Sequence, residues 1–244
     1  MAEKKLPAKQ EVLLPQTSIK GRGFEHEVDK NDYIIPRAKL LQALSPEVAA
    51  TGSKLKAGQI INSLTLEALP ITFVPLFWFP QWIRFNARKP GEAGWEANYA
   101  AGAMIWRSKD PSDPRVLEEG KFGDNGEVPL ATKFLNFFSI FIGHSMPVII
   151  SFSKTSYKAG KKLITLASLT GGDMFGKQYN LSSKFIDGEQ GKYHILEVNP
   201  SGLLANDSKA FKVSEILYEN YKEKPVEVHE VDKGEANDVE DIKT

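Results

Sequence analysis

Residues 71–88, with the sequence ITFVPLFWFPQWIRFNAR, form the most aromatic run of the chain. β-Branched and aromatic residues fill this run, and Pro75 and Pro80 disfavour a helix. The pattern predicts two β-strands with a tight turn at Pro80 and Gln81. Both faces of the first strand are apolar, as is typical of a strand buried on both sides. We therefore expect the chain to fold around an aromatic hairpin.

The second half of this run has two different faces. Trp82, Arg84, Asn86 and Arg88 alternate with apolar residues, so a strand would present them together on one side. An aromatic ring beside two guanidinium groups can stack a base and hold a phosphate. The alternative is a surface strand whose tryptophan is partly covered by a loop. The pattern alone leaves both interpretations open.

The remaining sequence predicts a mainly β fold with a few helices (α+β). Two long loops, at 89–102 and 109–129, separate the expected elements. Residues 134–152 carry no charged side chain, but interspersed polar residues indicate two buried strands rather than a membrane span. The expected strands are 58–65, 103–107, 131–142, 147–152, 179–186 and 193–198, and the expected helices are 37–44, 153–169 and 208–222.

Composition excludes several classes of function. The 244 residues contain no cysteine, which rules out disulfides, thiolate zinc sites and a cysteine nucleophile. The four histidines are far apart and no nucleotide-binding or hydrolase motif occurs, so we expect no enzyme activity, no metal and no cofactor. The first residues lack the apolar core of a signal peptide, which favours the cytoplasm, the host's if the chain is phage-encoded.

Charge is distributed unevenly along the chain. Lysines and arginines equal acidic residues at 31 each, but residues 225–244 hold seven acids and two lysines. Residues 1–224 therefore carry a net charge of +5 and the C-terminal tail −5. We expect a flexible N-terminal arm (1–30), a single domain (31–224) and a disordered tail that contacts partners. The tail acids are Glu227, Glu230, Asp232, Glu235, Asp238, Glu240 and Asp241.

Tryptophans and basic residues are interleaved between positions 78 and 109. Aromatic rings stack bases, and lysines and arginines follow the phosphate backbone, so this pattern favours binding of single-stranded nucleic acid. Trp78 and Trp106 could instead belong to the core. The candidate nucleic-acid contacts are Trp82, Arg84 and Arg88, then Trp95, Trp106, Arg107 and Lys109, and Lys154 and Lys161 from the basic face of the predicted 153–169 helix.

The combination of short strands, long loops, a basic body and an acidic tail resembles single-stranded-DNA-binding proteins built on an OB-type antiparallel β-barrel with flanking helices. The resemblance implies that the tail covers the binding groove when DNA is absent. It also implies that the tail recruits replication or recombination proteins when DNA is bound. Because residues 134–152 are predicted to form two buried strands, we also expect no contact with a membrane.

Three segments are similar to a family of tailed-phage early proteins associated with single-stranded-DNA binding. They are YIIPRAKLLQALSPEV at 33–48, GQIINSLT at 58–65 with the following Phe73-Val-Pro75, and PVIISFSKTSYKAGKKL at 147–163. The resemblance implies sequence-independent binding of single-stranded DNA in phage replication or recombination. The competing hypothesis is a virion structural or assembly protein that uses the aromatic surface for protein contacts.

Overall fold

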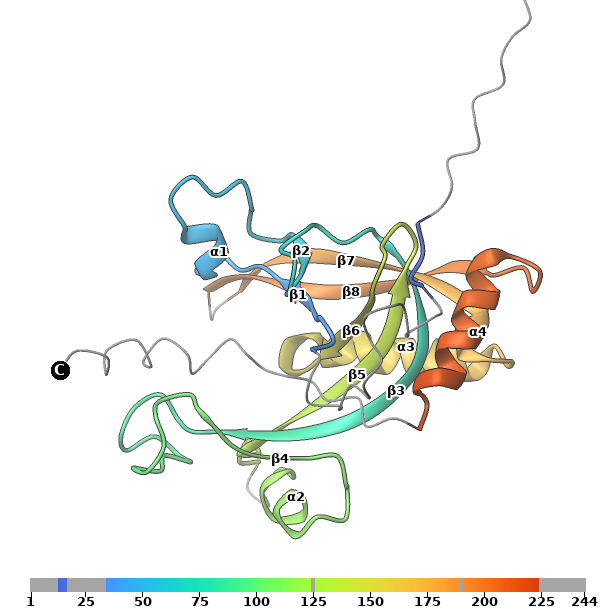
Figure 1. The fold of residues 1–244 in the computed structure, drawn as a ribbon. Coiled ribbons are helices and arrows are strands. Elements are labelled where there is room, and N and C mark those ends of the chain that lie inside the picture. The colour runs from blue at the N-terminus through green and yellow to red at the C-terminus, as the bar shows by residue number, and fades with distance from the viewer. Residues whose placement is uncertain (1–12, 17–33, 124–125, 189–190, 224–244) are drawn as a thin grey trace, which may run out of the picture.

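The computed structural model describes residues 13–16, 34–123, 126–188 and 191–223 (Figure 1). Antiparallel strands dominate it, and the described part also contains four α-helices, so the predicted α+β class is confirmed. The main sheet has the order β6-β5-β3-β7-β8, and β4 pairs with the far end of β3. Its strands are β3 (Thr72–Phe85), β4 (Met104–Ser108), β5 (Ala131–Phe141), β6 (Pro147–Phe152), β7 (Lys177–Gly188) and β8 (Gly191–Leu203).

The aromatic run forms one continuous strand, β3, so the predicted turn at Pro80 and Gln81 is wrong. β3 pairs with β5 along nearly its whole length. On its other side, β7 pairs only with Thr72 and Phe73, and β4 pairs only from Trp82 onward. Both prolines lie between these two partners, and Pro75 adjoins a shift in register. A proline without an amide hydrogen is tolerated at such a one-sided or bulged position.

The segment after Pro36 is also different from the prediction. Residues expected to be helical form β1 (Ala38–Leu40), which pairs with β2 (Ile60–Asn62), and the helix α1 (Pro46–Ala49) begins later. The amide of Ile149 in β6 donates to the carbonyl of Pro36 at 2.9 Å. Tertiary backbone pairing therefore decided the conformation here, against a local helical pattern.

The loop predicted at 109–129 contains a short helix, α2 (Pro114–Glu119). Asp113 caps it by accepting a hydrogen bond from the Arg115 amide at 3.0 Å. The Arg115 side chain also donates to this carboxylate, which holds the pKa of Asp113 well below its usual range. A helix of only six residues leaves little periodic pattern in the sequence.

The second half of the chain follows the prediction. The charge-free stretch forms β5 and β6, joined by a turn at Gly143 with φ near +100°. A 3₁₀ turn, η1 (Lys154–Ser156), leads into α3 (Tyr157–Leu169), and β7 and β8 form the expected hairpin. A second turn, η2 (Met174–Gly176), precedes β7, and Ser208 caps α4 (Lys209–Tyr221). Within the described ranges, no helix is long and apolar enough to cross a membrane.

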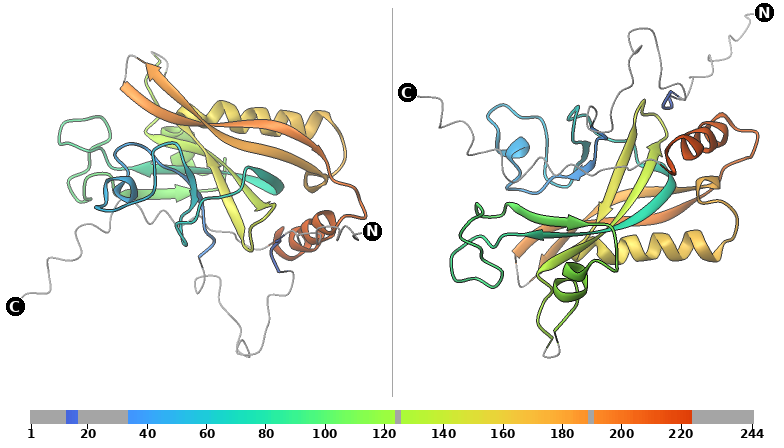
Figure 2. Two further views of the ribbon diagram at one scale, coloured as in Figure 1. Left: turned by 90° about the horizontal axis from the view of Figure 1, so that it is seen from above. Right: turned by 60° about the horizontal axis from the view of Figure 1, so that its bottom comes forward.

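The core lies on both faces of β5. Phe137 and Phe141 pack with Leu163 of α3, whereas Phe138 and Ile140 belong to the cluster that contains residues of α4. The two helices accordingly lie on opposite sides of this strand (Figure 2). Phe137, Phe138 and Phe141 are fully buried, so we expect truncation of one of them to alanine to cost about 3–5 kcal/mol.

A smaller cluster stands apart from this core. It lies where β3 extends past β6 and β7 and pairs with β4 and β5. It consists of Trp82, Trp106, Val116 and Ala131, from β3, β4, α2 and β5. We call residues 82–84 of β3, together with residues 89–103, β4 and α2, the tryptophan lobe; it occupies the bottom left of Figure 1.

The segment around β1 lies between the two strands that end the sheet order, β6 and β8. Arg37 forms a parallel bridge with Ile149 of β6. The side-chain amide of Gln42 bonds both backbone groups of His194 in β8, at 2.9 and 2.8 Å. This segment thus connects both edges of the sheet and forms one wall of the groove described below.

Candidate nucleic-acid interface

The Trp82 and Arg84 side chains, our first predicted DNA contacts, are buried in the tryptophan lobe. They are 6% and 7% exposed. The Arg84 guanidinium pairs with Glu119 at 2.6 Å and with Glu96 at 2.9 Å, and it donates to the Gly94 carbonyl. The Trp82 ring lies against Gly120, at the end of α2. The short helix α2, which the sequence did not predict, covers the strand face that carries Trp82 and Arg84.

Trp106 has a similar structural role. Its ring is buried, and its Nε1 donates to the second oxygen of Glu119 at 2.8 Å. Lys133 lies 4.9 Å from the centre of the Trp82 ring, and Arg115 lies 5.1 Å from the Trp106 ring. The Trp82 and Trp106 rings and the terminal nitrogens of Arg84 thus have partners among neighbouring cations and carboxylates. The prediction that Trp82, Arg84 and Trp106 contact DNA is not supported by their position.

The other predicted contacts are distributed over several surfaces. Trp95 and Arg107 are half-buried in the tryptophan lobe, and Lys109 lies 4.7 Å over the ring of Phe79. Lys161 is exposed on α3. Arg88 and Lys154 are brought together in one groove, although 66 positions separate them in the sequence. The acidic tail lies outside the described residues.

This groove, which we call the basic groove, has a volume of about 610 Å³. It lies between the β1 segment, the ends of β3, β5 and β6, η1 and β8. Within the described residues, no aspartate or glutamate lines it. Its cations are Arg37, Lys39, Arg88 and Lys154, and its rings are Phe85, Phe134 and His194. Low-dielectric walls lined by one sign of charge concentrate the opposite charge.

One of the groove's cations has a carboxylate partner. The Lys39 ammonium lies 2.6 Å from Glu47, at the start of α1. Lys39 therefore contributes less free positive charge than its position suggests. Arg88 and Lys154 carry exposed side chains at the mouth of the groove, where a phosphate could approach them.

A chain of hydrogen-bonded polar side chains runs from the groove into the sheet. Ser151 donates to the Asn136 amide at 2.7 Å, and Asn136 donates to Gln81 at 3.2 Å, so one chain of hydrogen bonds crosses β6, β5 and β3. Asn136 and Gln81 are almost completely buried, and these bonds satisfy polar atoms that would otherwise be costly there. The Ser151 hydroxyl lines the groove at the end of this chain.

The walls of the groove have a constrained backbone at Lys154 and close packing around His194. Lys154 has φ near +46°, a left-handed conformation that costs roughly 1–2 kcal/mol for a residue with a side chain. The His194 ring lies 5.3 Å from Phe185, and a methyl group on Gly58 would come within 2.6 Å of that ring. Such close approach explains why a glycine stands at position 58.

Sequence reasoning missed Arg37, Lys39, Phe85, Phe134 and His194. The sequence predicts a helix at Arg37 and Lys39, and residues two positions apart on a helix point in different directions. Reading residues 37–40 as a strand would have placed these two cations on one face. Phe134 and His194 carry no local signal, because only the tertiary fold brings them to the groove.

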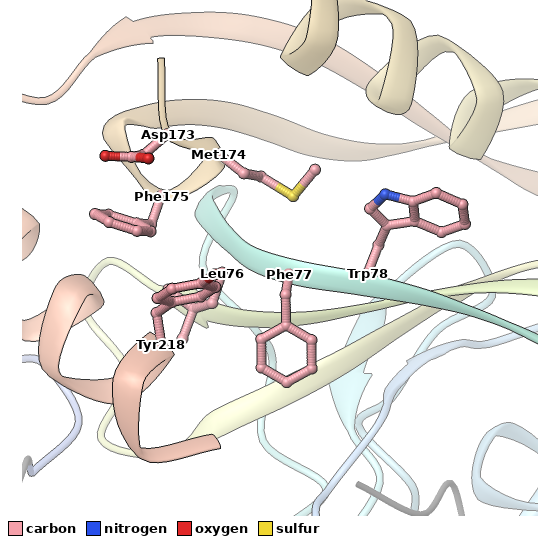
Figure 3. Close-up of a pocket in the computed structure, with 7 residues that line it drawn as sticks. All are labelled: Leu76, Phe77, Trp78, Asp173, Met174, Phe175 and Tyr218. Carbon is pink, nitrogen blue, oxygen red and sulfur yellow. The ribbon is translucent and has the colours of Figure 1, made fainter. Parts of the chain in front are cut away.

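A second hollow is lined mainly by apolar and aromatic side chains (Figure 3). It measures about 240 Å³ and lies between β3, η2 and α4. Trp78 borders it and is 39% exposed, whereas Trp106, the other tryptophan for which we considered a core position, is buried. Asp173 is its only charged lining residue within the described ranges, which makes it a poor phosphate site. No cluster of three potential metal ligands occurs in the described part of the chain.

Comparison with known proteins gives one match. The family model of the Pam3 phage gp34-like protein matches residues 3–227, which is nearly the whole chain. Comparisons with curated proteins and with solved structures give no match. The match supports the phage origin that the three quoted segments indicated. On this extent of similarity, the chain belongs to the Pam3 phage gp34-like protein family.

Proposed function

We propose that this protein binds single-stranded DNA in the basic groove, without sequence preference, during phage DNA replication or recombination. The observation that carries the proposal is the groove itself, in which four cations and three aromatic rings converge and no described carboxylate lines the surface. Cations that follow a backbone, interleaved with rings that stack bases, are the usual means of binding single strands without sequence readout.

The strand order supports an OB-type architecture for the domain. In an OB-fold, a long first strand pairs with both the second and the fourth, and oligonucleotides bind on the face of strands two and three and on the loops after strands one and four. β3 pairs with β5 and β7 in this way, and α3 lies between β6 and β7 in the sequence. The basic groove borders the ends of β5 and β6 and the start of the long loop after β3.

The proposed mechanism divides the contacts into two kinds. Arg37, Arg88 and Lys154 neutralise phosphates, and the rings of Phe85 and His194 stack bases. Stacking contributes about 1–3 kcal/mol per base. Release of counterions gives a log–log dependence of affinity on salt with a slope of about −0.7 for each phosphate neutralised.

The position of α4 supports a role for the acidic tail. Tyr221, in its last turn, packs on Phe138 of β5, with ring centres 4.9 Å apart. Phe134 of the groove lies on the same strand face, four residues or roughly 13 Å away. Tyr221, two residues before the last described residue Glu223, therefore lies on the side of the sheet that carries Phe134. We propose that the seven tail acids compete with DNA for the groove and are available to partners when DNA displaces them.

The test compares two double variants that remove the same charge. Arg88→Gln with Lys154→Gln removes two exposed cations of the basic groove, and Lys161→Gln with Lys212→Gln removes two exposed lysines outside it. Anisotropy of a labelled oligo-dT should show at least a tenfold loss of affinity for the first variant and little change for the second. Equal affinities of the two variants, or no binding by the unchanged protein at low salt, would overturn the proposal.

A virion assembly role has one observation in its favour. Leu117, Phe122 and Val128 are 48%, 72% and 78% exposed in and after α2, and exposed apolar side chains are suited to contacts with another protein. A partner protein bound there should stay bound in moderate salt, whereas DNA in the basic groove should dissociate. Salt-resistant assembly together with absent oligo-dT binding would favour this second function.

A further inference from the structure

A third hollow adjoins the basic groove and extends it along α3. It measures about 240 Å³ and lies between α3 and β8. Thr155 and Leu196 line both hollows, and the Leu196 amide donates to the Ser156 hydroxyl at 3.0 Å, so the two hollows meet across η1. We call this hollow the lysine cleft.

The lysine cleft is positively charged. Lys158 and Lys162 line it, four residues apart on one helix face and therefore about 6 Å apart along the axis. Glu197 is the one acidic residue among its described lining residues, and Lys184 of β7 lies 3.6 Å from that carboxylate. Lys162 donates to Asn199 of β8 at 2.8 Å, which holds its ammonium over the cleft.

The cleft differs from the basic groove in having no lining phenylalanine, tryptophan or tyrosine among its described residues. It offers ammonium groups, the Thr155 hydroxyl and the Asn199 amide above an apolar floor that includes Ile195. These groups suit phosphates and sugars rather than stacked bases. Contacts of this kind contribute affinity that depends on salt and not on sequence.

We propose that a bound single strand passes over η1 and continues from the basic groove into the lysine cleft, where Lys158 and Lys162 contact its phosphates. This proposal rests on the proposed function and defines its ligand as a strand long enough to occupy both hollows. It also revises the predicted contacts on this helix, because Lys161 lines neither hollow whereas its neighbours Lys158 and Lys162 do.

The experiment measures binding of oligo-dT of about 5 and about 20 nucleotides, a range that brackets one OB-type site. Lys158→Gln with Lys162→Gln is compared with the charge-matched Lys161→Gln with Lys212→Gln. For the long strand, the first pair should lower affinity about tenfold and reduce the salt slope by about 1.4, because two phosphate contacts are lost. The short strand, held in the basic groove, should be affected no more than it is by the control pair.

Two results would overturn this inference, and each differs from failure of the proposed function. If the long strand responds equally to both pairs, the strand does not enter the cleft. If the short strand loses as much affinity as the long one, the lysines act through overall charge and not as a path. Failure of the proposed function appears instead as absent binding by the unchanged protein, or as insensitivity to Arg88→Gln with Lys154→Gln.

Discussion

The tryptophan lobe and the basic groove are built from the same kinds of residue and are suited to different tasks. In the lobe, Arg84 meets the carboxylates of Glu96 and Glu119, and the Trp106 ring donates to Glu119. In the groove, Lys39 pairs with Glu47, and no aspartate or glutamate lines the surface among the described residues. An aromatic residue beside an arginine therefore indicates a binding surface only where acidic partners are absent and the ring face is open.

The largest effect should come from breaking the lobe at its shared carboxylate. Glu119→Ala removes an ion pair from the buried Arg84 and the acceptor of Trp106, and we expect about 3–5 kcal/mol lower free energy of unfolding. Urea denaturation measures the change. Glu118→Ala, at the exposed neighbouring position, is the control and should cost less than about 0.5 kcal/mol. A small effect of Glu119→Ala would mean that the lobe is held by apolar packing alone.

A smaller effect, on binding rather than stability, should follow loss of a groove ring. Phe85→Leu removes the ring and keeps an apolar side chain, and we expect oligo-dT affinity to fall by about 1–3 kcal/mol. Trp106→Phe, in the lobe, should leave affinity unchanged although it lowers stability. Titrations of both folded variants under one buffer condition make the comparison. A larger loss of affinity for Trp106→Phe would return the binding site to the lobe.

Strain at Lys154 gives a finer comparison. Lys154→Gly and Lys154→Ala remove the same charge, but only glycine adopts φ near +46° at little cost. The glycine variant should be more stable than the alanine variant by about 1 kcal/mol, while both bind oligo-dT equally weakly. Thermal melts and titrations of the two variants provide the measurements. Equal stability would show that the left-handed conformation at this position is not maintained in solution.

The smallest effect should come from removing residues 225–244. Loss of a segment with net charge −5 should tighten oligo-dT binding several-fold at low salt and have no effect at high salt, where charges are screened. The lobe offers no such basic surface, so its stability should not respond to the deletion. Unchanged affinity at low salt would remove the tail from the mechanism.

Most elements of the fold could be predicted from the sequence, but the site could not. The apolar runs of β5 and β6 end at a glycine turn, α3 and α4 have amphipathic patterns, and Ser208 caps α4, so local signals identify these elements. β3 continues through Pro75 and Pro80 because neither β4 nor β7 pairs with it at these positions. The sequence contains no local mark of that arrangement.

For a related reason, the sequence could not show which of the predicted contacts are buried. Whether Arg84 is exposed depends on Glu119, 35 positions away, and on a six-residue helix with almost no periodic pattern. The basic groove collects residues from seven elements between β1 and β8, so no short window of sequence contains it. Arg88 and Lys154 were predicted singly, and only the folded sheet places them together.

The bond between Gln42 and His194 joins residues 152 positions apart. During synthesis on the ribosome, Arg37, Lys39 and Arg88 are therefore made long before β8, the strand that completes the groove. Contacts of such long sequence separation also form late in folding, since the chain must first close a large loop. We expect DNA-binding activity to appear only after about four-fifths of the protein has been synthesised, so unfinished chains would not occupy single-stranded DNA.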